Sequence, residues 1–280
     1  MYRRESPQVY RARRAIVASA VVLVLFAGFK LVGPDAGSSA APTTTTSTST
    51  TLKPKLPACK VGETISTQDP KKDWAQILVD TDLALPPTYG PPDLHNISDA
   101  GFPFTAGQAL RGFVMHDLSE LRKAAAANGT PISIIASYRS FQTQQDLFAK
   151  RVDQLGDSEA GSRVARPGHS EHQLGTTIDV TSQGLTDVDQ SWGSSTTGQW
   201  IKSNSYKYGF IVSYPAEASD QTCYDYEPWH LRYVGKDMAA EVIKSGLTLR
   251  EYLWKLDPHE PSAAATSTTT TSTTPSTSSQ

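Results

Sequence analysis

Two stretches of small polar residues limit how much of this chain can build a hydrophobic core. Residues 38–52 read SSAAPTTTTSTSTTL, and residues 262–280 read SAAATSTTTTSTTPSTSSQ. Segments of this kind bury too little apolar surface to offset the chain entropy that folding removes, which is typical of flexible tethers. We therefore predict a linker at 34–55, one folded domain at 56–260 and a disordered tail at 261–280. A domain of about 205 residues is long enough to enclose a core of its own.

The N-terminal part of the chain predicts export from the cytoplasm. Residues 1–14 contain five arginines and one acidic residue, and an apolar segment follows at 15–33. Basic residues ahead of an apolar segment predict a cytoplasmic N-terminus and an exported remainder. The uninterrupted apolar part ends at Phe29, which is short for a membrane span of about 20 residues. Two interpretations therefore stay open. The segment is either a single-pass transmembrane anchor or a signal peptide cleaved near the small residues at 36–41, in which case the domain is secreted.

Charge and cysteine content narrow the choice of partners. Without residues 1–30, the chain carries 20 basic and 27 acidic residues, which argues against a nucleic acid partner. The two cysteines, Cys59 and Cys223, predict one intramolecular disulfide in an oxidising compartment. The alternative is a pair of unlinked buried thiols. Without a CxxC motif, two distant cysteines give little support for a metal site of their own.

Helical and strand patterns do not alternate regularly along the domain. Apolar residues at helical spacing predict a long helix over 107–129 that ends at an Asn-Gly pair. β-Branched runs predict strands at 132–137, 177–181 and 210–215. Further helices are predicted within 137–156, 157–168, 197–209, 236–246 and 248–254, the last with a capping box formed by Thr248 and Glu251. This order favours an α+β fold, in which a small, mainly antiparallel sheet packs with helices.

Histidines and carboxylates in two separate stretches are candidate metal ligands. His172 and Asp179 lie in SEHQLGTTIDV, and His230 ends the stretch EPWH. Catalytic zinc sites use three such ligands and leave one position for water. Glu227 could serve as the base for that water, and Pro228 interrupts regular strand pairing, which would let both side chains of the stretch face one pocket. Each pair alone is as compatible with an ordinary polar cluster, and spacing does not decide between the two.

Three motifs together carry a resemblance to a known family. They are SYRSFQTQ at 137–144, PGHSEHQLGTTID at 167–179 and EPWHLRYVG at 227–235. In this order they resemble the motifs of the VanY-like D-alanyl-D-alanine carboxypeptidases, zinc metallopeptidases of bacterial cell walls. The resemblance covers residues 76–255. It implies a fold of the kind shared by hedgehog domains and DD-peptidases.

The resemblance also implies a metal and a base. One zinc ion would be bound by His172, Asp179 and His230. Glu227 would be the general base, which takes a proton from the attacking water. A purely structural role for these residues is the alternative.

Three further residues are predicted to bind the substrate. The resemblance implies that Arg139 binds the carboxylate of the substrate or the developing oxyanion, which suits a planar and permanently charged group. Gln144 and Ser170 are predicted to contact the substrate. Ser213 occupies a position where the family often has arginine, and we expect it to alter substrate binding.

The implied function is removal of a C-terminal D-alanine from peptidoglycan stem peptides at the outer face of the membrane. Three alternatives stay open within the fold: an L,D-carboxypeptidase, a D,D-dipeptidase, and a wall-binding module without turnover. A serine-type carboxypeptidase would need an SxxK motif, and the domain at 56–260 contains none.

Overall fold

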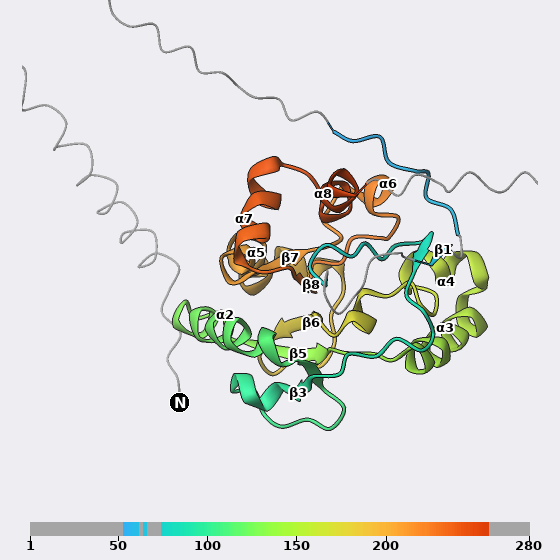
Figure 1. The fold of residues 1–280 in the computed structure, drawn as a ribbon. Coiled ribbons are helices and arrows are strands. Elements are labelled where there is room, and N and C mark those ends of the chain that lie inside the picture. The colour runs from blue at the N-terminus through green and yellow to red at the C-terminus, as the bar shows by residue number, and fades with distance from the viewer. Residues whose placement is uncertain (1–52, 62–63, 66–73, 258–280) are drawn as a thin grey trace, which may run out of the picture. The chain divides into compact units, whose positions relative to one another are not determined.

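A four-stranded antiparallel sheet forms the centre of the fold (Figure 1). The computed structural model describes residues 53–61, 64–65 and 74–257. Within these ranges the sheet has the order β5-β6-β8-β7, and every neighbouring pair is antiparallel. The strands are β5 (Ile132–Ala136), β6 (Thr177–Ser182), β7 (Phe210–Val212) and β8 (His230–Tyr233). The predicted α+β class with a mainly antiparallel sheet is confirmed.

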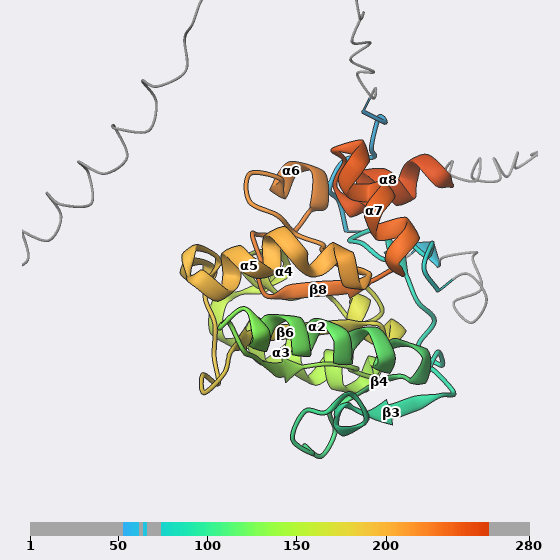
Figure 2. The same ribbon diagram turned by 90° about the vertical axis from the view of Figure 1, so that its left-hand side faces the viewer.

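Helices pack around this sheet, and two further strand pairs lie beside it. In Figures 1 and 2, α2 and α5 lie along the sheet, whereas α3 and α4 lie together beyond the end of β5. The α-helices are α2 (Met115–Ala127), α3 (Phe141–Leu155), α4 (Asp157–Arg163), α5 (Thr196–Asn204), α6 (Ser219–Thr222), α7 (Lys236–Ser245) and α8 (Leu249–Leu256). The outer strands pair as β1 (Thr64–Ile65) with β2 (Leu83–Ala84), parallel, and β3 (Leu94–Asn96) with β4 (Ala109–Arg111), antiparallel. The described residues also form five 3-10 helices: η1 (Ile97–Ala100), η2 (Gly112–Val114), η3 (Glu171–Leu174), η4 (Gln190–Ser194) and η5 (Ser205–Tyr208).

The alternation of side chains along β6 and β8 separates the core from the polar pocket. Ile178 and Val180 of β6 and Leu231 of β8 are fully buried members of the main apolar cluster. Because successive side chains of a strand point to opposite faces, Asp179 lies on the other face of the sheet. His230 is the register partner of Asp179 in β8 and lies on the same face. Core packing on one face therefore positions two polar side chains on the other.

The helix predicted over 107–129 begins later than expected. Its first residues, Ala109–Arg111, form β4 and pair with β3, and α2 starts only at Met115. The prediction was wrong because Leu110 and Val114, both fully buried, satisfy helical spacing as well as a strand followed by a turn. Its predicted end at Asn128-Gly129 is confirmed.

Two other local predictions are confirmed. Thr248 and Glu251 form the capping box at the start of α8. Cys59 and Cys223 form a disulfide with a Cα–Cα distance of 5.2 Å. The disulfide ties the start of the described domain to the loop that follows α6.

The predictions for the two ends of the chain fall outside the described residues. This applies to the basic leader at 1–14, the apolar segment at 15–33, nearly all of the linker at 34–55, and the tail at 261–280. Among the helices that the structure describes, none combines the length and hydropathy that a membrane span requires.

Candidate metal centre

Three elements bring the predicted ligands to one point. Asp179 and His230 face each other across β6 and β8, and His172 comes from η3, which precedes β6. Gly175 ends η3 with a φ of 72°, and a Cβ atom there would lie 2.9 Å from the side chain of Pro91. A residue without a side chain is therefore needed for the chain to turn from η3 into β6.

The ligand atoms of these three residues converge. His172 Nε2 and His230 Nδ1 each lie 3.3 Å from Asp179 Oδ1, and all three atoms lie within 4.8 Å of one another. Both histidines are buried. His172 Nε2 and Asp179 Oδ1 have no hydrogen-bond partner among the described residues, although both atoms are buried. Buried polar atoms are rarely left without a partner, so this arrangement fits a site that could hold a metal cation.

The outward nitrogen of each histidine ring is held by the protein. His172 Nδ1 donates to the carbonyl oxygen of Ser137 at 2.7 Å, and His230 Nε2 donates to Glu171 Oε2 at 2.9 Å. These bonds orient each ring so that Nε2 of His172 and Nδ1 of His230 face Asp179. Such outer contacts are usual for histidines that bind a metal.

Glu171 is a site residue that the sequence analysis left out. Its buried carboxylate accepts from Arg232 Nη1 at 3.0 Å and from Ser213 Oγ at 2.7 Å, in addition to His230. Burial alone would raise the pKa of Glu171, but the bond from His230 and the charge of Arg232 lower it to about 2. The carboxylate is thus charged at neutral pH and orients His230.

Ser213 is not among the residues that line the pocket with the ligands. Its hydroxyl donates to Glu171 Oε2 at 2.7 Å, so it supports His230 through that carboxylate, and its expected effect on substrate binding stays a prediction. The sequence signal for the role of Glu171 was its position next to His172, because the approach of Glu171 to Ser213 and Arg232 depends on the tertiary fold.

The pKa values of the three candidate ligands are shifted in different ways. Burial, together with the charge of Arg139, lowers the pKa of His172 to about 4, so its ring is neutral. Burial lowers the pKa of His230, but Asp179 and Glu171 outweigh this effect and raise it to about 10. Burial raises the pKa of Asp179, but the neighbouring histidines hold it well below its usual value. A divalent cation at this point would replace the proton of His230, since metal binding and ligand protonation compete.

Glu227 lies beside the ligands, as predicted. Its Oε2 is 3.4 Å from His230 Nδ1, and the turn through Pro228 is closed by a backbone bond from His230 N to Glu227 O at 3.2 Å. Burial and the negative charge of Asp179 raise the pKa of Glu227 to about 7, although His230 and Arg139 act against this shift. A carboxyl group with such a pKa can accept and release a proton near neutral pH.

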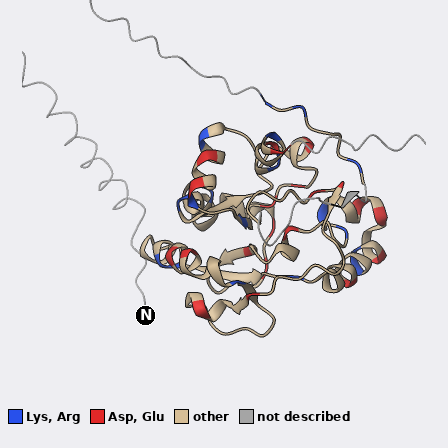
Figure 3. Cartoon of the chain, viewed as in Figure 1, with Lys and Arg blue, Asp and Glu red and all other residues tan. Residues whose placement is uncertain are grey.

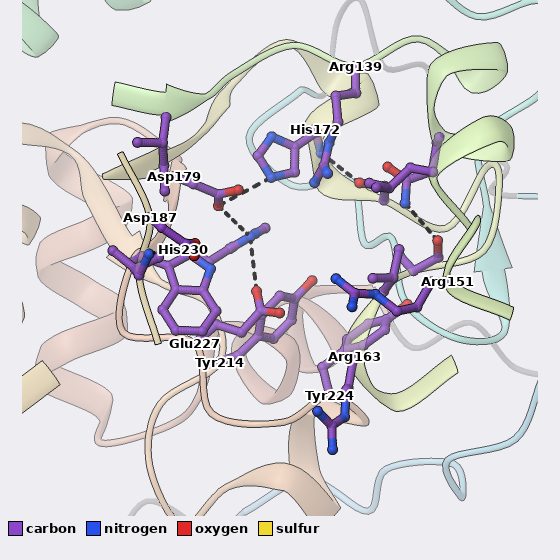
Figure 4. Close-up of a pocket in the computed structure, with 18 residues that line it drawn as sticks. Arg139, Arg151, Arg163, His172, Asp179, Asp187, Tyr214, Tyr224, Glu227 and His230 are labelled. Carbon is purple, nitrogen blue, oxygen red and sulfur yellow. Dashed lines mark hydrogen bonds and ion pairs between the residues drawn. The ribbon is translucent and has the colours of Figure 1, made fainter. Parts of the chain in front are cut away.

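A cavity of about 270 Å³ opens in front of these groups (Figure 4). Arg139, Gln144 and Ser170 all line it, as the sequence predicted. The buried Nε of Arg139 has no hydrogen-bond partner in the described ranges. Gln144 Nε2 donates to Ala165 O at 2.7 Å, whereas its Oε1 is unpaired. Ser170 Oγ accepts from His172 N at 3.4 Å and so caps η3.

Comparisons with known proteins agree with this geometry. Residues 107–236 match the family model "VanY: D-alanyl-D-alanine carboxypeptidase". The chain is 39% identical over 183 residues to the putative carboxypeptidase YodJ of Bacillus subtilis, covering 64% of this chain and 67% of the relative. It is 31% identical over 249 residues to a D-alanyl-D-alanine carboxypeptidase of Enterococcus faecalis, covering 85% and 88%.

Solved structures show the same likeness. The LdcB LD-carboxypeptidase superposes with a TM-score of 0.62 at 38% identity, covering 67% of this chain and 88% of that chain. A mutant of the vancomycin resistance D,D-pentapeptidase VanY in complex with Zn(II) superposes with a TM-score of 0.55 at 30% identity, covering 64% and 99%. From the shared motifs, the converging ligand atoms and these relatives, we conclude that the chain belongs to the VanY family of D-alanyl-D-alanine carboxypeptidases and is a peptidase.

Proposed function

We propose that this carboxypeptidase uses one zinc ion to remove a terminal D-alanine from peptidoglycan stem peptides. The observation that carries the proposal is the convergence of three buried ligand atoms, two of which have no hydrogen-bond partner among the described residues. The named relatives support the substrate, and the Zn(II) complex of the VanY mutant supports the metal.

The donor set fits zinc. His172, Asp179 and His230 offer two nitrogens and one oxygen, which is a common composition of catalytic zinc sites. Asp179, Glu227 and the two histidines all line the cavity, so the site has an open side toward substrate. When bound there, zinc supplies a Lewis acid that polarises the scissile carbonyl and lowers the pKa of water toward about 7.

Glu227 moves the proton. Its carboxylate lies beside the ligands and lines the same cavity, and its pKa of about 7 matches a group that is charged in part of the population at neutral pH. It would accept a proton from the attacking water and deliver it to the amine of the leaving residue. Two other acidic groups nearby have different roles: Glu171 holds His230, and Asp179 is a candidate ligand.

Arg139 binds and orients the anionic end of the substrate. Its side chain lines the cavity near His172, and its Nε lacks a partner in the described structure. A guanidinium can bind a carboxylate through two parallel hydrogen bonds, which fixes the position of the scissile bond. Gln144 and Ser170 would shape the adjoining wall.

A second candidate is an L,D-carboxypeptidase that trims tetrapeptides. The likeness to the LdcB LD-carboxypeptidase favours it, because that structure superposes with a higher TM-score than the VanY mutant. Both candidates use the same ligands and base and differ in the residue that precedes the cleaved bond.

We also propose that the domain works outside the cytoplasm, near the cell wall. The apolar segment at 15–33 after a basic leader supports export, either with retention in the membrane or with cleavage and secretion. The disulfide supports an oxidising compartment.

The function is tested by incubating the full chain with a stem pentapeptide ending in D-Ala-D-Ala and with the corresponding tetrapeptide. Mass spectrometry of the products separates loss of one residue from loss of a dipeptide. We expect release of one D-alanine, its loss after chelation, and its return when zinc is added back. Activity that survives complete removal of metal would contradict the zinc mechanism, and activity on the tetrapeptide alone would favour the second candidate.

A further inference from the structure

The cavity that contains the ligands continues into a larger one. The second cavity measures about 650 Å³ and shares Arg151, Arg163, Val188, Glu227 and Trp229 with the first. The smaller space suits the single residue that leaves the peptide. The rest of the peptide must then extend into the larger space, because the two cavities are continuous through these shared walls.

One wall of this outer cavity carries two arginines. Arg151 comes from α3 and Arg163 ends α4, and both line both cavities. Figure 4 shows them on the side away from Asp179 and His230. Acidic positions accompany the basic ones on α3 and α4 (Figure 3), so the two helices are not uniformly basic. The cationic character belongs to the two side chains that line the cleft.

These two arginines have few partners in the protein. Arg151 Nη1 donates to the neutral Gln154 Oε1 at 3.3 Å, and the described residues place no carboxylate within 4.0 Å of its guanidinium. Arg163 Nη2 pairs with Glu159 Oε1 at 2.8 Å, but both side chains are about half exposed (54% and 52%), and such pairs contribute little. Each guanidinium has five N–H donors, so most of them stay available to a ligand.

Acidic side chains also line these cavities. Asp187 lines the first and Asp189 and Asp225 line the second, and none forms an ion pair with Arg151 or Arg163 in the described part of the chain. Asp225 lies beside α4, because its backbone N donates to Ser162 O at 3.3 Å. Asp189 Oδ1 is already used by Ser191 N at 2.8 Å. An anionic group on a bound peptide is attracted to the two arginines and repelled by these carboxylates.

We propose that Arg151 and Arg163 form an anion subsite, which binds a free carboxylate on the part of the peptide upstream of the scissile bond. This inference rests on the proposed peptidase function and deepens it. The ligand class is a peptide with a side-chain or α-carboxylate that is not the C-terminus. Arg139 would bind the C-terminal end, so the substrate would be held at two anionic points.

The test uses two peptides that differ in one group. Both end in D-Ala-D-Ala, and the residue upstream carries either a free carboxylate or the corresponding carboxamide. We expect the full-length protein to favour the carboxylate peptide by about tenfold in kcat/KM, mainly through KM, as a charge-assisted contact in a partly exposed site would give. In the double variant Arg151→Gln, Arg163→Gln this preference falls to about one, because kcat/KM for the carboxylate peptide falls more than kcat/KM for the carboxamide peptide.

Lys150→Gln is the matched control, because Lys150 is an exposed neighbour on α3 that lines neither cavity. It should keep the tenfold preference. Equal loss of both peptides in the double variant would overturn the subsite, since it would mean that the arginines bind the shared C-terminus or support the fold.

A binding measurement separates this inference from the proposed activity. Calorimetry with the full-length Glu227→Gln variant needs no turnover. We expect it to bind the carboxylate peptide about tenfold more tightly than the carboxamide peptide, and the added Arg151→Gln and Arg163→Gln changes to remove the difference. Equal affinities for the two peptides would overturn the subsite, whether or not the wild-type protein cleaves either of them.

Discussion

Two buried polar clusters in this domain use their polar atoms in different ways. In the structural cluster, Asp80 and Arg250 form an ion pair at 2.7 Å with both side chains almost fully buried. Asp80 Oδ1 also accepts from the backbone N–H groups of Asp82 and Leu83 at 2.9 and 2.8 Å. Every oxygen of this carboxylate is satisfied by the protein, and the pair ties the segment before β2 to α8.

The candidate metal centre buries a comparable set of groups but leaves two converging atoms unpaired, whereas in the structural cluster Arg250 Nη2 is the unpaired atom among the described residues. His172 Nε2 and Asp179 Oδ1 are buried, close together and without hydrogen-bond partners in the described structure, and His230 Nδ1 faces the same point. Burying such atoms costs free energy unless something completes them. The difference teaches that burial alone does not identify a functional site. A group of buried atoms that lack hydrogen-bond partners and converge on one point does identify such a site.

Among the variants that test this comparison, we expect Glu227→Gln to have the largest effect on activity. The variant removes the proton acceptor and leaves all three ligands in place, so kcat should fall by about 10² to 10⁴ while metal affinity is kept. Steady-state kinetics and metal titration measure the two quantities. Glu120→Gln on the exposed face of α2 is the control. Full activity in the Glu227→Gln variant would show that Glu227 is not the general base.

Breaking the structural cluster should affect stability and not chemistry. Arg250→Met leaves Asp80 as an uncompensated buried charge, and we expect the free energy of unfolding to fall by about 3 to 5 kcal/mol. Urea denaturation measures this change, and metal titration of the folded variant should give an unchanged affinity. A variant as stable as the wild type, or one with weakened metal binding, would show that the two clusters are not separate.

A smaller effect is expected when the support of His230 is weakened. Glu171→Gln removes the charge that orients His230 and balances Arg232, so metal affinity or activity should fall by about 10- to 100-fold. Ser213→Ala removes one hydrogen bond to the same carboxylate and should have a milder effect. If a folded Glu171→Gln variant kept the wild-type zinc affinity, Glu171 would not position His230.

The smallest effect concerns an ionic cluster near the surface. Burial alone would raise the pKa of Asp117, but Lys236 at 2.7 Å, Tyr233 and His116 outweigh this effect and lower it. A carboxyl group with a lowered folded-state pKa stabilises the protein above its unfolded pKa of about 4, and this contribution is lost as the pH falls through the folded value.

The variant Asp117→Asn tests that contribution. It should cost about 0.2 to 1 kcal/mol at neutral pH, after allowance for solvent screening, and its difference from the wild type should shrink below about pH 4. Denaturation curves between pH 3 and 7 measure the trend. A difference that is constant with pH would exclude a role for the charge of Asp117.

Much of the site was predictable because its residues lie in short motifs. The stretch from His172 to Asp179 and the EPWH turn contain the candidate ligands and Glu227. In the same way, the capping box of Thr248 and Glu251 predicted the start of α8. The strand at 177–181 was predicted from its alternation, and the structure shows that this alternation places Asp179 on the face opposite the core.

Other features depend on contacts that no local pattern encodes. Glu171 of η3 meets Arg232 of β8 and Ser213, which follows β7, only because the tertiary fold brings these segments together. Leu110 fits a helix and a strand equally well, and pairing of β4 with β3 decided between them. Arg151 is one of many helical arginines until the fold places it on the wall of the cleft.

The most direct test of the central claim is crystallography of the full-length protein with zinc, with anomalous data collected at the zinc edge. The account predicts one strong peak within about 2.0 to 2.2 Å of His172 Nε2, Asp179 Oδ1 and His230 Nδ1. No peak at this point, or a peak bound by other residues, would contradict it.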